Sequence, residues 1–86
     1  MKIRVLKKDI DMGRPHSAQR CPIARALRRA GFKNVMVFSG GFSNNGTVRV
    51  KYKFPDIVNL FIERFDHDWT VKPFTFTLPD TILKSR

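Results

Sequence analysis

The chain contains a thiol, two imidazoles and several carboxylates in positions where they could perform chemistry. Cys21 follows His16 by five residues, and His67 lies between Asp66 and Asp68. A cysteine at the start of a helix and next to an arginine has a lowered pKa, and a nearby histidine could activate it as a nucleophile. The same side chains could also ligate a metal ion, although their spacing matches no zinc pattern.

Structural roles explain these residues more simply. Cys21 is the only cysteine and precedes a proline, where a small half-buried side chain is common. Asp66, His67 and Asp68 fall where a helix is predicted to end, and such residues usually cap the helix and pack there. The glycine-rich stretch at residues 39–46 lacks the lysine of a phosphate-binding loop and lies between two predicted strands. We therefore expect a non-enzymatic protein with no catalytic residue, no metal and no cofactor.

The distribution of charge is the strongest chemical signal in the sequence. The net charge is +10, and residues 1–53 carry thirteen Lys/Arg against two Asp, whereas residues 54–86 carry four Lys/Arg against five acidic residues. Basic groups close to phosphates release counterions and accelerate encounter with a polyanion. The sequence therefore predicts binding to DNA or RNA. An acidic protein surface is the alternative partner, and a basic surface that needs no charge-driven partner is the third interpretation.

The periodicity of apolar residues predicts the elements that would position these charges. Alternating apolar and polar residues predict strands at residues 2–6, 35–38, 47–54 and 74–78. Helical spacing predicts one helix from Pro22 to Ala30 and another from Pro55 to about residues 66–69. Residues 9–19 are predicted to be a surface loop and residues 39–46 a hairpin loop. The first of these is long for a loop, which indicates either a function or an additional helical turn.

The order β-α-β-β-α-β is that of the ferredoxin-like, or split βαβ, sandwich. In this α+β fold one antiparallel sheet carries two helices on one face and leaves its other face open. With 86 residues the chain is predicted to form a single domain over residues 1–86, which is too small to enclose a deep active site easily. Whether strand edges pair into a homodimer stays open.

Two basic surfaces are candidate contacts in this architecture. The arginines of the first helix have no compensating acid in that helix, and planar guanidinium groups suit phosphates, bases and carboxylates. On the outward face of the strands, including the basic strand at residues 47–53, bases could stack on an aromatic ring while phosphates meet cations. An ordinary solvated surface would explain either one. The candidate binding residues are Arg4, Arg20, Arg25, Arg28, Arg29, Lys33, Phe38, Arg49, Lys51 and Lys53.

Three segments resemble one group of known proteins. They are Asp9 to Gly13, Cys21 to Leu27, and Phe65-Asp66 followed by Pro73 to Leu78. Together they resemble small, mostly uncharacterised proteins of tailed phages and prophages, which carry an Asp-Ile-x-x-Gly turn, a Cys-Pro-Ile-Ala-x-Ala-Leu helix start and a Pro-Phe-x-Phe-x-Leu strand. The resemblance spans most of the chain and supplies no catalytic residues. It implies a phage-encoded accessory protein in the bacterial cytoplasm, a class that includes nucleic-acid binders and small inhibitors of host machinery.

The alternative function is therefore inhibition of a bacterial host protein or defence system. The first-helix arginines would dock on an acidic or nucleic-acid-binding surface, with exposed Met36, Phe38 or Phe42 as apolar anchors. Strand register decides whether these three residues are exposed in this way or belong to the core.

Other features favour a cytoplasmic protein that is not bound to a membrane. A single cysteine cannot form an internal disulfide, charges interrupt the apolar residues at 1–8, and no stretch approaches the roughly 20 apolar residues of a membrane span.

Overall fold

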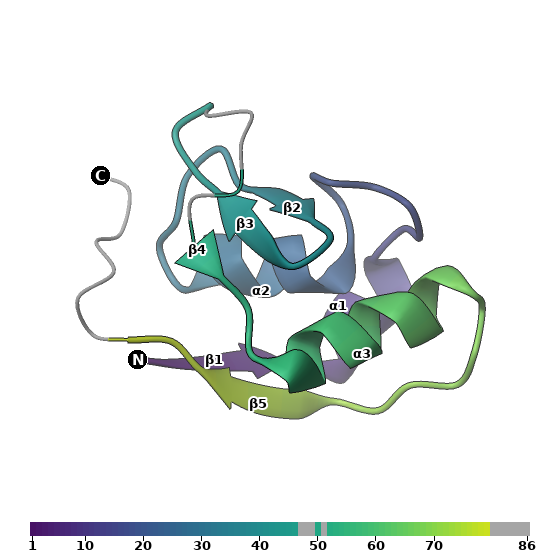
Figure 1. Cartoon of the computed structure of the whole chain (residues 1–86). Coiled ribbons are helices and arrows are strands. Elements are labelled where there is room, and N and C mark those ends of the chain that lie inside the picture. Colours follow the sequence, from purple (N-terminus) through teal and green to yellow (C-terminus); the bar gives the residue numbers. More distant parts are fainter. Residues whose placement is uncertain (47–49, 51, 80–86) are drawn as a thin grey trace.

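The architecture comes from a computed structural model, which describes residues 1–46, 50 and 52–79 (Figure 1). The elements in chain order are β1 (Lys2–Val5), α1 (Lys7–Met12), α2 (Pro22–Arg29), β2 (Met36–Phe38), β3 (Gly41–Ser43), β4 (Tyr52–Lys53), α3 (Asp56–Asp66) and β5 (Phe74–Thr77). The predicted α+β class is confirmed. None of the helices in the described part of the chain is long and apolar enough to cross a bilayer.

The strands lie in two antiparallel sheets (Figure 1). β1 pairs with β5, with Ile3 opposite Phe76 and Val5 opposite Phe74, so the two ends of the described chain form one ribbon. The second sheet has the order β2-β3-β4. The ferredoxin-like order is not confirmed, because the described strands form these two sheets instead of a single one. α2 contacts both sheets, through β1 and β2.

The predicted loop at residues 9–19 begins with a helix, α1, that apolar periodicity did not reveal. Its six residues are mostly charged, and only Ile10 and Met12 are apolar. The backbone N–H of Leu6 donates a hydrogen bond to Oδ2 of Asp9 at 2.8 Å, which satisfies one of the donors left open at the helix start. A short helix of this kind is fixed by capping and tertiary contacts and not by an amphipathic pattern. The described part of the chain therefore has three helices where two were predicted.

The predicted hairpin loop at residues 39–46 contains a strand, β3. A tight turn at Ser39 and Gly40 joins β2 to β3, and Gly40 has a φ of +89°, which L side chains rarely adopt. A Cβ on Gly41 would lie only 2.2 Å from the carbonyl oxygen of Tyr52, so β3 and β4 approach too closely for a side chain. The glycines that predicted a loop thus permit close strand packing. Of the strand predicted at 47–54, residues 47–49 and 51 lie outside the described residues.

The two predicted helices are confirmed. α2 begins at Pro22, with Cys21 as its N-cap, and Gly31 follows its end with a φ of +112°. α3 begins at Asp56 after Pro55, as the proline predicted.

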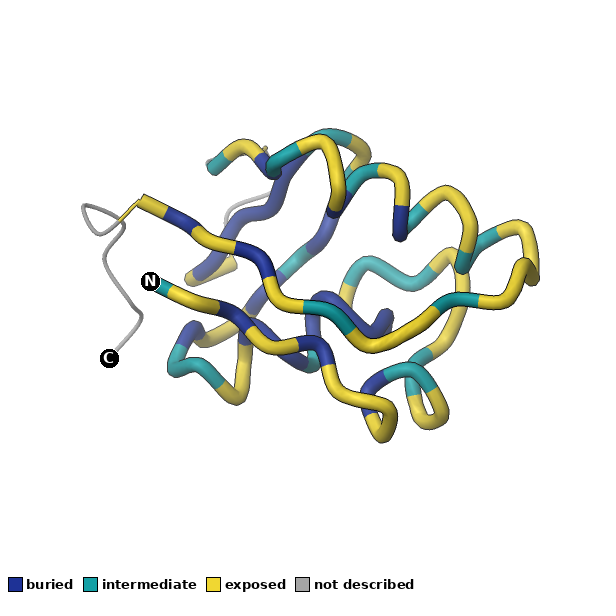
Figure 2. The backbone as a smooth tube through the Cα atoms, turned by 90° about the horizontal axis from the view of Figure 1, so that it is seen from below, coloured by how far each residue is buried: buried dark blue, intermediate teal, exposed yellow. Residues whose placement is uncertain are grey.

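An aromatic cluster joins the two sheets in the core. The ring of Phe42 lies 5.4 Å from that of Phe32, 5.2 Å from Tyr52 and 5.4 Å from Phe54. Phe54 then contacts Phe76 of β5 at 6.1 Å. Because Phe42 is 0 % exposed, the prediction that it is an exposed apolar anchor is wrong. Figure 2 shows the alternation of buried and exposed residues along β1 that directs this strand's apolar side chains to the same core.

We predict that Gly13→Ala lowers the free energy of unfolding by about 1–3 kcal/mol, as overpacking usually does. Gly13 has an ordinary φ of −72°, but its Cβ would lie 2.6 Å from the carbonyl oxygen of Asp9 and 2.6 Å from Cδ of Pro22. Urea denaturation measures the change. Lys8→Ala, at an exposed position of α1, is the control and should change stability by less than about 0.5 kcal/mol. Wild-type stability in the Gly13 variant would contradict this tight packing.

Candidate nucleic-acid interface

The arginines of α2 have a compensating acid, which comes from α1. The carboxylate of Asp9 is 0 % exposed, and Arg29 donates to both of its oxygens, at 2.7 Å each. The same guanidinium donates to the backbone carbonyl of Arg4 at 2.6 Å, and Nε of Arg25 lies 3.6 Å from Oδ1 of Asp9. As predicted, α2 itself contains no acid, and the counter-charge for two of its arginines comes from α1. Arg25 and Arg29 hold α1 and β1 against α2.

Opposing effects act on the pKa of Asp9. Burial raises it, while hydrogen bonds from Arg29 and from the Leu6 backbone, together with the charges of Arg29 and Arg25, lower it. The net result is a pKa below the ordinary range of an aspartate. The carboxylate is therefore charged at neutral pH, and the same hydrogen bond raises the pKa of Arg29.

Arg28, on the same helix, secures the preceding loop. One of its terminal nitrogens donates to the backbone carbonyl of Gln19. Within the described residues this is the only hydrogen bond of that side chain, so the remaining guanidinium donors are available to a ligand. The bond also fixes the direction of the guanidinium group. Arg28 is thus exposed and oriented at the same time.

A hollow of about 460 Å³ places Arg28 beside Arg20. Arg20 is exposed, and its backbone N–H donates to Oγ of Ser17 at 3.0 Å, which holds the loop in a turn. Half-buried Met36 of β2 gives the hollow an apolar part. The other residues that line it, among those the structure describes, are Gln19, Asn34, Val35 and Gly46. Two arginines, two residues with side-chain amides and a methionine therefore line one hollow.

The other candidate binding residues are dispersed. Lys33 is exposed and precedes Asn34 of the hollow. Arg4 and Lys53 are exposed on β1 and β4, which belong to different sheets, so they do not form one continuous basic face. Phe38 is half-buried and lines a different cavity. Arg49 and Lys51 lie outside the described residues.

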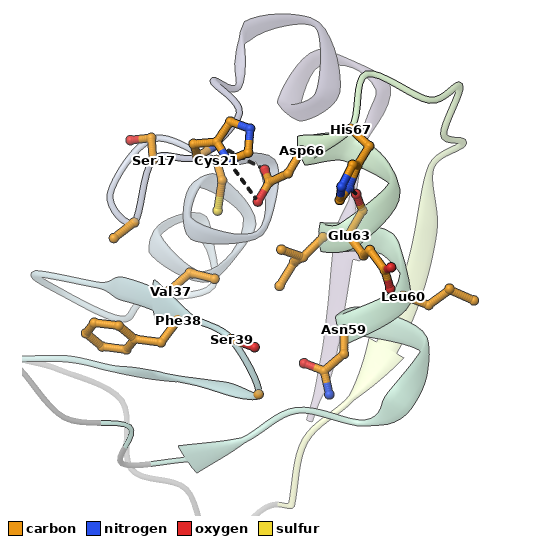
Figure 3. A pocket seen from close by; sticks show the side chains of 14 residues that line it. Ser17, Cys21, Val37, Phe38, Ser39, Asn59, Leu60, Glu63, Asp66 and His67 are labelled. Atoms are coloured by element: carbon orange, nitrogen blue, oxygen red, sulfur yellow. Dashed lines mark hydrogen bonds and ion pairs between the residues drawn. The ribbon is translucent and has the colours of Figure 1, made fainter.

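That different cavity brings together the residues that suggested thiol chemistry (Figure 3). The backbone N–H of His16 donates to Oδ1 of Asp66 at 3.0 Å, and Nδ1 of the His16 ring lies 3.8 Å from Oδ2. Cys21 is only 5 % exposed, and its Sγ accepts a hydrogen bond from the backbone N–H of Ala24 at 3.4 Å. Burial raises the pKa of the Cys21 thiol, which disfavours the nucleophilic thiolate. Across the described residues, no three His, Cys, Asp or Glu side chains are placed to hold a metal ion.

No protein-family model, curated protein or solved structure matches this chain. Functional inference therefore depends on the geometry and charge of the chain itself.

Gln19 and Asn34, which line the hollow, are absent from the predicted binding residues because neither lies in a regular element. Asn34 has a φ of +52°, a conformation in which asparagine is enriched, and the sequence signal available was only its position before a predicted strand. No local sequence pattern indicated that Asn34 would line the same hollow as Arg20 and Arg28.

We predict that Asp9→Asn lowers the free energy of unfolding by about 2–3 kcal/mol, because it leaves two partly buried arginines without their counter-charge. Asp11→Asn is a matched control on the same helix. Its exposed pair with Lys7, at 2.8 Å, should contribute less than about 0.5 kcal/mol. Urea denaturation of both variants measures the difference. Equal effects would show that the Asp9 interactions do not stabilise the fold.

The lowered pKa of Asp9 also predicts acid destabilisation. Its contribution is fully present above the unfolded-state pKa of about 3.9 and is lost as the pH falls through the lower folded-state pKa. Stability measured between about pH 6 and pH 2.5 should therefore fall more steeply below pH 4 in the wild type than in Asp9→Asn. Parallel curves for the two proteins would contradict this assignment.

Proposed function

We propose that this chain is a small, non-enzymatic accessory protein that binds nucleic acid with limited sequence specificity. The observation that carries the proposal is the hollow in which Arg20 and Arg28 meet beside Met36. The net charge of +10 supports it, because a field of that sign attracts polyanions. The proposed interface consists of the hollow and the neighbouring Lys33.

The residue types in the hollow suit a single nucleotide of a longer strand. Guanidinium groups bind phosphate oxygens through two parallel hydrogen bonds, and the side-chain amides of Gln19 and Asn34 can meet base edges. The apolar surface of Met36 can contact the face of a base. A volume of about 460 Å³ lies within the usual range of small-ligand sites. The arrangement favours single strands, in which bases are accessible.

The arginines of α2 divide into two roles in this proposal. Arg25 and Arg29 satisfy the buried carboxylate of Asp9 and keep α1 in place. Arg28 faces the hollow, where its bond to the Gln19 carbonyl reduces the entropy lost when it binds a phosphate. Phosphate contact therefore depends on Arg20 and Arg28, and the first-helix arginines do not act as one uniform patch.

The resemblance to tailed-phage proteins is the basis for proposing that the chain acts in the cytoplasm of a bacterial host. Inhibition of a host protein or defence system is the alternative. The same hollow would then meet an acidic or nucleic-acid-binding surface, with half-buried Met36 and Phe38 as apolar contacts.

We predict that Arg20→Gln/Arg28→Gln weakens binding of a labelled single-stranded oligonucleotide about tenfold at about 0.1 M salt. The slope of log K against log salt should also fall by about 1–2, since each lost phosphate contact removes about 0.7 from a single-strand slope. Fluorescence anisotropy with single-stranded DNA, duplex DNA and RNA measures both quantities. The variant's fold is verified by circular dichroism.

Arg64→Gln/Lys72→Gln is the matched control, since it removes the same charge from two exposed residues outside the hollow. Equal losses in the two double variants would show diffuse attraction without a defined interface. Absence of salt-sensitive binding by the wild type would overturn the nucleic-acid proposal. A host protein retained by the chain from nuclease-treated lysate, and released by the Arg20/Arg28 variant, would then support the alternative.

A further inference from the structure

The larger cavity of about 590 Å³ is separate from the hollow around Arg20 and Arg28, and the two share no lining residue. It lies between α3, the loop before α2 and the turn from β2 to β3 (Figure 3). The His16–Asp66 contact closes one end, because it ties the loop to the last turn of α3. The remainder is open to solvent and is large enough for a small molecule.

Hydrogen-bond acceptors on α3 dominate the polar part of this cavity. Asn59, Glu63 and Asp66 follow one another at intervals of four and three residues, so they lie along the same side of the helix. Oδ1 of Asn59 is buried and accepts no hydrogen bond. The Glu63 carboxylate forms no hydrogen bond or ion pair with any described residue, although backbone groups near it are bonded. Oδ1 of Asn59 and the Glu63 carboxylate are therefore acceptors without a hydrogen-bond donor among the described residues.

The charge of the cavity is opposite to that of the chain. The chain has 17 Lys and Arg among 86 residues, yet neither type occurs among the lining residues that the structure describes. The histidines His16 and His67 are the only cavity side chains there that can become cationic. The ring nitrogen Nδ1 of His67 already lies 2.8 Å from the Glu63 carbonyl oxygen, and its ring packs 6.0 Å from Trp69. A ligand with its own positive donors would complement the free carboxylate.

Apart from Ser17 and Ser39, the described side chains in the rest of the lining are apolar or small. Val37 and Phe38 contribute from β2 and Leu60 and Ile62 from α3, and Leu60 is 44 % exposed. Carboxylates beside apolar side chains suit a cation that carries an apolar body, because a carboxylate pairs with the charge and the apolar side chains cover the body. We propose that this cavity binds a small organic cation, with an ammonium or amidinium head on the Glu63 side and an apolar body against the apolar part of the lining.

Benzamidine is a suitable probe, because it joins an amidinium group to an aromatic ring. Titration into the full ¹⁵N-labelled chain should give saturable shifts of backbone signals from the lining residues. Benzamide, the neutral analogue of the same shape, should give none that saturate over the same concentrations. Glu63→Gln should weaken benzamidine binding about tenfold, the effect expected from losing a charged hydrogen-bond partner.

Asp56→Asn is the matched control, since it removes one carboxylate from the first turn of α3 outside the cavity lining. It should bind benzamidine like the wild type. Equal binding of benzamide, absence of saturation, or equal affinities of the Glu63 and Asp56 variants would each overturn the proposal. Glu63 is exposed, so its substitution should leave the fold intact. The proposal is independent of nucleic-acid binding, which Glu63→Gln should preserve.

Discussion

The buried carboxylate of Asp9 is the interaction on which the placement of the basic residues depends. A charge removed from water must be paired and hydrogen-bonded, and here the partners come from α2 and from the start of α1. The bidentate pair with Arg29 fixes α1 against α2, and the bond from Arg29 to the Arg4 carbonyl adds β1 to the same unit. These contacts hold β1, α1 and α2 in one fixed arrangement.

This constraint determines which arginines remain for a partner. Arg25 and Arg29 form ion pairs with Asp9. Arg28 of the same helix and Arg20 of the preceding loop instead line the hollow. Arg28 donates a hydrogen bond to the carbonyl of Gln19, and both residues line the hollow. The basic residues near α2 therefore form two sets. Arg25 and Arg29 stabilise the fold through Asp9, and Arg20 and Arg28 line the hollow. Total charge alone does not distinguish the two.

The same loop that carries Arg20 also bounds the acceptor-rich cavity. Its His16 end is attached to Asp66 of α3, whereas its Arg20 end leads into α2. The loop therefore separates a basic hollow from an acidic cavity within a few residues. Its position is stabilised by backbone hydrogen bonds to neighbouring elements, including that from Val37 to the Ala18 carbonyl at 2.7 Å. Both the hollow and the cavity include residues of this irregular segment.

The sequence by itself determined the α+β class, the starts of α2 and α3, and the presence of an excess of positive charge, because proline position, apolar period and composition are local properties. It predicted a strand at 35–38 and one at 74–78, and β2 and β5 lie within those limits. Tertiary structure decided the separation into two sheets, the burial of Phe42 and the pairing of Asp9 with arginines about twenty residues away. These features depend on contacts between segments distant in the chain, and no local pattern of residue types specifies which charged side chains will meet when the core closes.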